Sequence, residues 1–150
     1  ACIEDGQLSE KKGISVVVRK GSFMAKKDIF LKAGFVLADT FPPDFELLTL
    51  KFDNKAKEPQ FKHFSAKKYE HGLTIMRSPQ CPYSEKNVNA IVKTAEKMGI
   101  SVSLIELNDA ESAQQSPCAF GTFAIIYNGE MISHHPISNT RFQNIMKSKL

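Results

Sequence analysis

Cys81 opens the short motif Cys81-Pro82-Tyr83-Ser84, which lies between an apolar run at 73–76 and a helical pattern. From position 88 to position 98, apolar residues recur at the spacing of one helix face. Unpaired backbone N–H groups at the start of a helix favour a thiolate over a thiol. Because a thiolate attacks disulfides, Cys81 is a candidate redox nucleophile. The alternative is that Cys81 is a small buried hydrophobic residue.

Composition sets the class of protein. The chain has 150 residues, of which 42% are hydrophobic and 24% charged, values typical of one ordinary or two small water-soluble domains. No run approaches the ~20 apolar residues of a membrane helix, and the acidic, polar N-terminus does not resemble a signal peptide. Three cysteines, too few for a disulfide framework, favour a reducing cytoplasm. We therefore expect a cytoplasmic protein with no membrane partner.

Two halves with different patterns position these residues. In the first half we expect a helix ending over 8–12, strands at 14–18, 35–38 and 45–52, a helix over 24–33 with Ile29 and Phe30 inward, and a break at 40–44. Residues 53–71 are polar without a sustained period, which predicts a linker. The second half reads as strand 73–77, helix 83–98, strand 101–107, a short helix at 109–114, strands 122–127 and 130–133, and helix 139–147. Asn128-Gly129 between the last two strands predicts a tight hairpin.

The second half, residues 72–150, resembles glutaredoxin-like domains of the thioredoxin fold, with Ser84 in place of the second cysteine of the motif. The Ser84 hydroxyl is expected to cap the helix or to donate to the Cys81 thiolate. The resemblance places Cys118 just before the strand that flanks the active site, where it would act as resolving thiol. The alternative is a loop cysteine without a role. Cys81, Ser84 and Cys118 are therefore the candidate catalytic residues.

The first half, residues 1–52, resembles the C-terminal half of a GNAT-family acetyltransferase, carried by the strand at 14–18 and the string Phe30-Leu31-Lys32-Ala33-Gly34-Phe35. With the second half it resembles the YoaP-like acetyltransferases. The resemblance implies a partial GNAT-like mixed sheet followed by a thioredoxin-like domain, an α/β (α+β) fold. It also implies acetyl transfer from acetyl-CoA to a small-molecule or peptide amine in a longer parent protein.

Departures from the GNAT pattern change what we expect of this chain alone. The Gly-rich turn that binds the acetyl-CoA pyrophosphate would precede Ala1, and Phe23 and Phe30 stand where the family often has a cofactor-contacting Asn and a general-acid Tyr. Phenylalanine cannot donate a proton. We therefore expect no cofactor for this chain and no transfer by it alone. The alternatives are a thiol-disulfide oxidoreductase using Cys81 and a non-catalytic module that binds a partner or substrate.

Charge and histidine placement argue against two further classes of protein. The basic surplus peaks at 51–68, a segment without a nucleic-acid-binding motif, so a solvated linker is favoured over a nucleic-acid contact. His134 and His135 are adjacent, and adjacent side chains on a strand point to opposite faces and chelate poorly together. The sequence therefore predicts neither a nucleic-acid partner nor a metal site.

Overall fold

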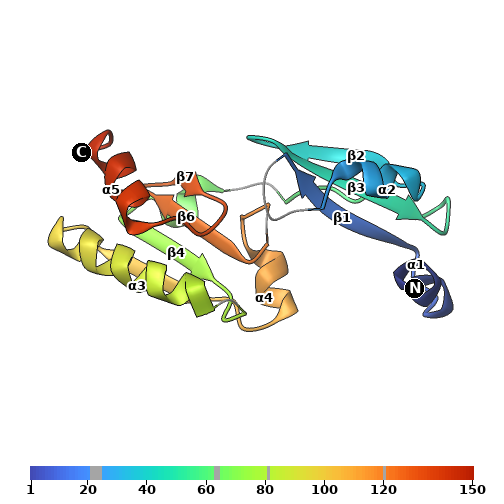
Figure 1. Cartoon of the computed structure of the whole chain (residues 1–150), viewed down its shortest axis with the longest axis horizontal. Coiled ribbons are helices and arrows are strands. Elements are labelled where there is room, and N and C mark those ends of the chain that lie inside the picture. The colour runs from blue at the N-terminus through green and yellow to red at the C-terminus, as the bar shows by residue number, and fades with distance from the viewer. Residues whose placement is uncertain (21–24, 63–64, 81, 120) are drawn as a thin grey trace. The chain divides into compact units, whose positions relative to one another are not determined.

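A computed structural model of the chain describes residues 1–20, 25–62, 65–80, 82–119 and 121–150. They form two compact units, Ala1–Lys62 and His63–Leu150. Within them lie two β-sheets and five α-helices, which confirms the mixed α+β class (Figure 1).

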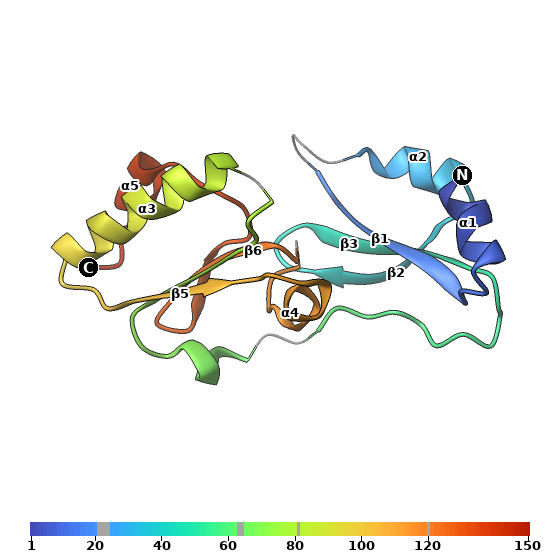
Figure 2. The ribbon, with the colours of Figure 1, turned by 90° about the horizontal axis from the view of Figure 1, so that it is seen from below.

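The first unit is a three-stranded antiparallel sheet with helices on one face. Strand β3 (Phe45–Lys51) lies between β1 (Gly13–Arg19) and β2 (Val36–Phe41) and pairs antiparallel with both. Figure 2 shows helices α1 (Cys2–Leu8) and α2 (Lys27–Lys32) on the same side of this sheet. Its buried core cluster, under these helices, consists of Val18, Phe35 and Leu48.

Several predicted boundaries in this unit are wrong. Helix α1 ends at Leu8 instead of continuing to residue 12, and the described part of the predicted 24–33 helix is helical only over α2. Ile29 is 61% exposed, whereas Phe30 packs toward the core. Neighbouring residues differ by about 100° around a helix, so a short helix on one sheet does not bury both. Strand β2 also extends to Phe41, into the predicted break.

Gly34 ends helix α2 as the sequence predicts. It has a φ of 90°, in the left-handed region that glycine adopts without a Cβ clash. The Gly34 amide donates to the Leu31 carbonyl, and the Phe35 amide donates to the Phe30 carbonyl. These bonds satisfy carbonyls at the end of the helix and turn the chain into β2.

Parts of the predicted 53–71 linker pack on the unit to which they belong. In the first unit, the Phe61 amide donates to Asp39 Oδ2 over 2.8 Å, and the Phe61 and Phe41 ring centroids are 5.5 Å apart. In the second unit, the short 3₁₀ helix η1 (Ala66–Tyr69) buries Tyr69. The polar composition of the segment did not predict these contacts.

The second unit contains a four-stranded mixed sheet. Its elements are β4 (Leu73–Arg77), α3 (Pro82–Lys97), β5 (Val102–Glu106), α4 (Ala110–Gln115), β6 (Phe123–Tyr127), β7 (Glu130–Ser133) and α5 (Asn139–Lys147). The strand order is β5-β4-β6-β7, with β4 parallel to β5, and β6 antiparallel to both β4 and β7. The predicted succession of strands and helices is confirmed, with ends that shift by one residue or so.

The hairpin between β6 and β7 is also confirmed. Asn128 and Gly129 have φ values of 47° and 81°, and Tyr127 pairs with Glu130 across the turn. A two-residue turn with both φ values positive matches the twist of the strands and favours Asn-Gly. Asn128 Oδ1 also accepts a hydrogen bond from the Gly72 amide over 2.8 Å, which links the turn to the start of β4.

Each face of this sheet carries its own apolar cluster. Helices α3 and α5 lie together over one face (Figure 2), and the helix-side cluster beneath them consists of Leu73, Ile75, Val88, Ile91, Ala95, Ile100, Phe123, Ile125, Ile137, Phe142 and Met146. Because strand side chains alternate, Met76 of β4 and Ala124 and Ile126 of β6 face the other side. There they form the second-face cluster with Tyr69, Leu107 and Cys118. The central strands are therefore covered on both faces.

Candidate functional site

The start of helix α3 holds one candidate residue in the described part of the chain. Pro82 is the first helical residue, a position where the missing N–H of proline costs nothing. Ser84 follows in the first turn and is 4% exposed. Cys81 lies outside the described residues. The structure therefore places the Ser84 hydroxyl in the interior of the unit and leaves the proposed reactivity of Cys81 a prediction.

Arg77, at the end of β4, forms ion pairs with the neighbouring strand β5 and with the helix α3 that follows it in the chain. Its Nη2 lies 2.7 Å from Glu106 Oε1 on β5 and 3.9 Å from Glu85 Oε1 in the first turn of α3. The Arg77 side chain is 12% exposed, whereas the Glu106 and Glu85 side chains are 45% and 62% exposed, so water screens both ion pairs. The sequence did not single out Arg77, although the parallel register pairs it directly with Glu106. Arg77 therefore fixes the strand end from which the chain leaves toward α3.

Cys118 lies between α4 and β6. Its amide donates to Ser116 Oγ over 3.2 Å, and its carbonyl accepts from the Gly121 amide over 2.9 Å. Gly121 has a φ of 85°, a conformation that side chains other than glycine rarely adopt. Ser116 Oγ in turn donates to Met76 Sδ on β4 over 3.8 Å. The backbone on both sides of the thiol is therefore held in place against the sheet.

The Cys118 thiol meets His134, which follows β7. Cys118 Sγ lies 3.7 Å from His134 Nδ1 and donates to the His134 carbonyl over 3.5 Å. Both distances are within hydrogen-bonding range for sulfur. His135 has a different partner, since its Nδ1 lies 2.7 Å from Ser133 Oγ. The two adjacent imidazoles therefore contact two different side chains: His134 contacts the Cys118 thiol, and His135 contacts the Ser133 hydroxyl.

The candidate residues are distributed over both faces of the sheet. Ser84 belongs to α3, which packs over the helix-side cluster, whereas Cys118 packs in the second-face cluster. The segments that carry Ser84 and Cys118 nevertheless meet at one end of the sheet, where the Ser78 amide donates to the Thr122 carbonyl over 2.9 Å. Pairing of Cys81 with Cys118 stays a prediction, because Cys81 is outside the described part.

Sequence reasoning considered His134 only as a metal ligand and missed its contact with Cys118. The hairpin offered a signal, because Ile125 of β6 pairs with Ser133 of β7. The residues before β6 and after β7 must therefore lie at the same end of the unit, which brings positions 118 and 134 near each other. No group of three or more His, Cys, Asp or Glu side chains suited to a metal ion occurs among the residues described.

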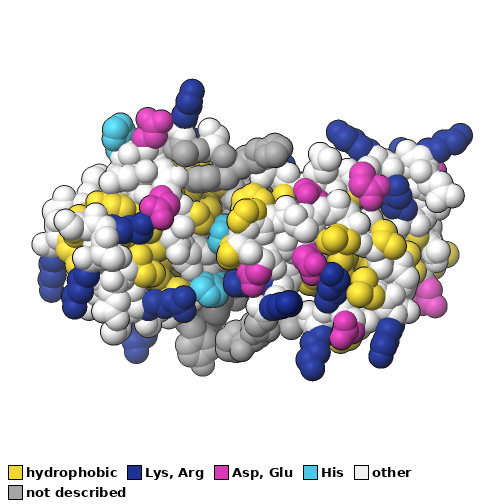
Figure 3. All heavy atoms as spheres, turned by 90° about the horizontal axis from the view of Figure 1, so that it is seen from above, with side chains coloured by type: hydrophobic (Ala, Val, Ile, Leu, Met, Phe, Trp, Pro, Cys, Tyr) yellow, Lys and Arg dark blue, Asp and Glu magenta, His cyan; other side chains and the backbone are white. Residues whose placement is uncertain are grey.

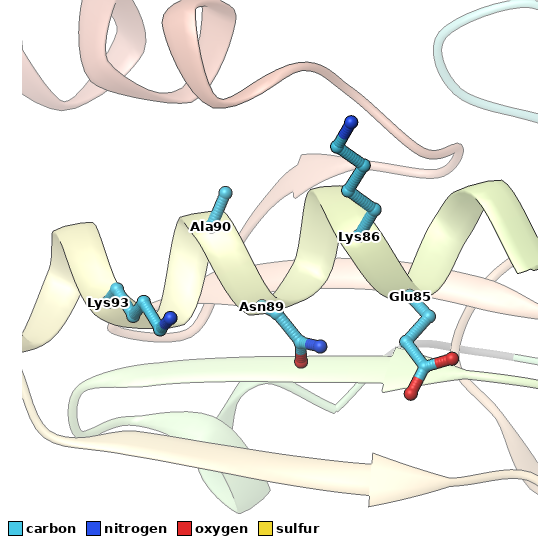
Figure 4. Close-up of a pocket in the computed structure, with 5 residues that line it drawn as sticks. All are labelled: Glu85, Lys86, Asn89, Ala90 and Lys93. Atoms are coloured by element: carbon cyan, nitrogen blue, oxygen red, sulfur yellow. The ribbon is translucent and has the colours of Figure 1, made fainter.

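A shallow hollow lies along the exposed side of α3, lined by Glu85, Lys86, Asn89, Ala90 and Lys93. Figure 4 shows that Lys86 and Ala90 project from one side of the helix, whereas Glu85, Asn89 and Lys93 project from the other. The two ammonium groups thus diverge instead of converging on one ligand position. The hollow therefore lacks the converging positive groups that would bind an anion.

Two titratable groups in the second unit have shifted pKa values. Burial raises the pKa of the Tyr69 phenol above its ordinary value of 10.0, because a charged phenolate is poorly solvated in the interior. Hydrogen bonds from the Ser112 amide and then the Ser112 hydroxyl lower the pKa of Asp109, the N-cap of α4, below 3.8. Tyr69 belongs to the same cluster as Cys118.

Comparisons with known proteins give one family-model match and one curated relative. In the part of the chain that the structure describes, no helix is long and apolar enough to cross a membrane. No solved structure matches the chain. Residues 102–144 match the family model described as YoaP-like. The chain is 30% identical over 151 residues to a Bacillus subtilis (strain 168) protein named "Uncharacterized N-acetyltransferase YoaP"; the alignment covers 98% of this chain and 60% of that protein. The chain is thus similar to a YoaP protein over nearly all of its own length, and spans 60% of the length of that relative.

Proposed function

We propose that this chain is part of a GNAT-family, YoaP-like acetyltransferase, and that it does not transfer acetyl groups by itself. The observation that carries the proposal is the 30% identity over 98% of the chain to a relative named an N-acetyltransferase. The reaction of the whole protein is acetyl transfer from acetyl-CoA to a small-molecule or peptide amine. The order β1-β3-β2 and the helix stop at Gly34 before Phe35 support the GNAT part of the proposal.

The side chain at position 30 supports the inactivity of the chain alone. Phe30 occupies the position of the family's general-acid tyrosine, and its ring packs edge-to-face on Phe35 with centroids 5.7 Å apart. A phenyl ring has no proton to give to a leaving thiolate. Phe23, the other departure from the GNAT pattern, lies outside the described residues. Acetyl-CoA is therefore a cofactor of a longer parent protein.

Calorimetry of residues 1–150 with acetyl-CoA tests this proposal. We expect no binding at micromolar concentrations and no release of free CoA in the presence of a small amine. A longer product of the same gene, carrying a Gly-rich turn before Ala1, is the positive control. Micromolar binding to residues 1–150 would overturn the inactivity of the chain. Failure of the longer product to bind acetyl-CoA would overturn the acetyltransferase assignment.

A second candidate function for the second unit is thiol-disulfide exchange at Cys81. It is favoured by one observation: helix α3 begins at Pro82, the residue after Cys81. The order β5-β4-β6-β7 with α3 and α5 on one face supports a thioredoxin-like fold. In this proposal Cys81 attacks a disulfide sulfur, Ser84 stabilises the helix start, and Cys118 resolves the mixed disulfide.

Competitive alkylation separates thiol chemistry from a binding role. With limiting iodoacetamide near neutral pH, Cys81 should be labelled before Cys2, which is exposed in α1. Ser84→Ala should slow Cys81 labelling if the hydroxyl stabilises the thiolate, whereas exposed Lys86→Ala in the same helix should change it little. Labelling of Cys2 with Cys81 untouched would favour a non-catalytic module that binds a partner or substrate.

A further inference from the structure

The contact between Cys118 and His134 has the form of a thiol with its own base. Cys118 Sγ lies 3.7 Å from His134 Nδ1. A nucleophile and a base within hydrogen-bonding reach are the recognised signature of an activated thiol. The residues are 16 positions apart and come from segments on either side of the β6–β7 hairpin. Their contact is therefore a product of the fold and not of local sequence.

The turn that carries the thiol holds it in one position. The amide and the carbonyl of Cys118 are both hydrogen-bonded, to Ser116 Oγ and to the Gly121 amide. The thiol itself also donates to the His134 carbonyl over 3.5 Å, so two atoms of one residue hold the sulfur. Placement of this kind lowers the entropy cost of bringing nucleophile and base together.

We propose that Cys118 and His134 form a thiol–imidazole pair that exchanges with small disulfides, independently of Cys81. In the tautomer that leaves Nδ1 unprotonated, the Cys118 S–H turns from the His134 carbonyl to Nδ1 and gives it the proton. The Cys118 thiolate then attacks one sulfur of the disulfide. The S–S bond of the small molecule breaks as the new S–S bond to Cys118 forms. The leaving thiolate takes the proton from the imidazolium, so the products are a mixed disulfide on Cys118 and one free thiol.

Size sets the class of substrate. Cys118 is 6% exposed and packs among Tyr69, Met76 and Leu107. Burial at this level excludes the disulfide of a folded protein, so the substrates of the proposed exchange are small, neutral or apolar disulfides. The YoaP-like family model spans 102–144, which contains both Cys118 and His134 and excludes Cys81. The pair belongs to the part of the chain that this family model describes.

Among the described residues, His134 is the base whose contact with the Cys118 thiol is established. Tyr69 in the same cluster is neutral near pH 7, as its ordinary pKa of 10.0 requires, and burial raises that pKa further. Lys68 Nζ lies 5.9 Å from the Tyr69 ring centroid. The acidic groups on the surrounding elements have other positions or partners: Asp109 and Glu111 at the exposed start of α4, Glu106 with Arg77, and Glu130 with Lys149.

The test uses the full chain with Cys2→Ser and Cys81→Ser, so that Cys118 is the remaining thiol. A dipyridyl disulfide releases a coloured thiopyridone, which gives the rate of exchange from pH 5 to pH 10. We expect the midpoint of the rate profile below about 8.5, the ordinary value for cysteine. His134→Asn should lower the rate at pH 7 at least ~10-fold, the change that corresponds to one pKa unit.

His135→Asn is the matched control, because its imidazole contacts Ser133 and not the thiol. It should leave the rate and the midpoint unchanged. Equal effects of the two histidine variants would overturn the proposal. If His134→Asn does not fold, the profile of the Cys118-only chain decides by itself, since a midpoint at or above 8.5 overturns the pair. Exchange that speeds up with urea in parallel with global unfolding would also overturn it, since the thiol would then react only in the unfolded chain.

Discussion

The two units bury their sheets to different degrees. The sheet of the second unit has an apolar cluster on each face. The first unit has one buried cluster, of Val18, Phe35 and Leu48, with Phe45 and Leu47 buried outside it. Among the described residues, the large hydrophobic side chains left exposed in the first unit are Leu8, Ile29, Leu31, Val36 and Leu37, against Met98, Leu104 and Leu150 in the second. Apolar side chains, yellow in Figure 3, are visible on the surface of the first unit (right). The comparison indicates that the second unit is the self-sufficient one, since burial of apolar surface is the main stabilising term.

The most direct test of this difference between the units is to express each of them alone. We expect residues 63–150 alone to unfold in one cooperative transition, followed by circular dichroism during heating. Residues 1–62 alone should show a broad transition or none, because their small core does not offset the entropy of folding. A cooperative 1–62 fragment, or a molten 63–150 fragment, would show that burial within each unit does not measure its autonomy.

Core truncations sharpen the comparison at the level of single side chains. Ile125→Ala in β6 and Leu48→Ala in β3 each empty a site that is 0% exposed. Each should lower the free energy of unfolding by about 2–5 kcal/mol. In urea titrations with probes specific for each unit, each variant should shift only its own unit. Leu104→Ala, at 42% exposure in β5, is the control and should change stability by about 0.5 kcal/mol or less.

The sequence predicted the features that depend on neighbouring residues. Asn128-Gly129 and Gly34 have positive φ values because the turn and the helix end require them, so residue type alone located both. The prediction that Ile29 points inward was wrong, because the sequence of the short helix α2 does not show which of its sides faces the sheet. The boundary of a short element and the direction of a short helix depend on the packing around them.

The site was less predictable than the fold, and for a related reason. Cys118 and Ser84 were selected by residue type and position, but the face of the sheet on which each packs depends on the course of the loops. His134 contacts Cys118 across 16 residues, through a turn held by Ser116 and Gly121. Such a contact depends on where the segments before and after the hairpin lie in the folded chain. A sequence motif therefore identifies candidate residues, but only the fold determines which of them are in contact.

The buried phenol of Tyr69 should make the stability of the second unit depend on pH in alkaline solution. Its pKa is raised by burial, so folding favours the protonated form. Stability from this group is fully present below pH 10 and is lost as the pH rises through the pKa of the folded state. Tyr69→Phe should flatten the loss of stability of the second unit above pH 10, in urea titrations. Tyr127→Phe in β6 is the matched control. An alkaline loss that is unchanged by Tyr69→Phe would show that the second-face cluster does not exclude charge.

The smallest effect is expected in acid, at the cap of helix α4. Ser112 donates its amide to Asp109 Oδ1 over 2.7 Å, and hydrogen bonds from Ser112 hold the pKa of Asp109 below its ordinary value. Folding therefore favours the carboxylate, so its stabilising contribution is present above about pH 4 and is lost as the pH falls through the lower pKa of the folded state. Asp109→Asn keeps an N-cap acceptor but removes the charge, so the second unit should lose less stability on acidification. Ser112→Ala keeps the amide bond to the carboxylate, which is the larger cause of the lowered pKa. It removes the hydroxyl, which also accepts from the Asp109 amide and donates to the Asp109 carbonyl. Ser112→Ala should therefore change the loss of stability on acidification less than Asp109→Asn does. An equal or larger change in Ser112→Ala, measured by urea titration between pH 2 and pH 5, would show that the hydroxyl and not the amide holds the carboxylate.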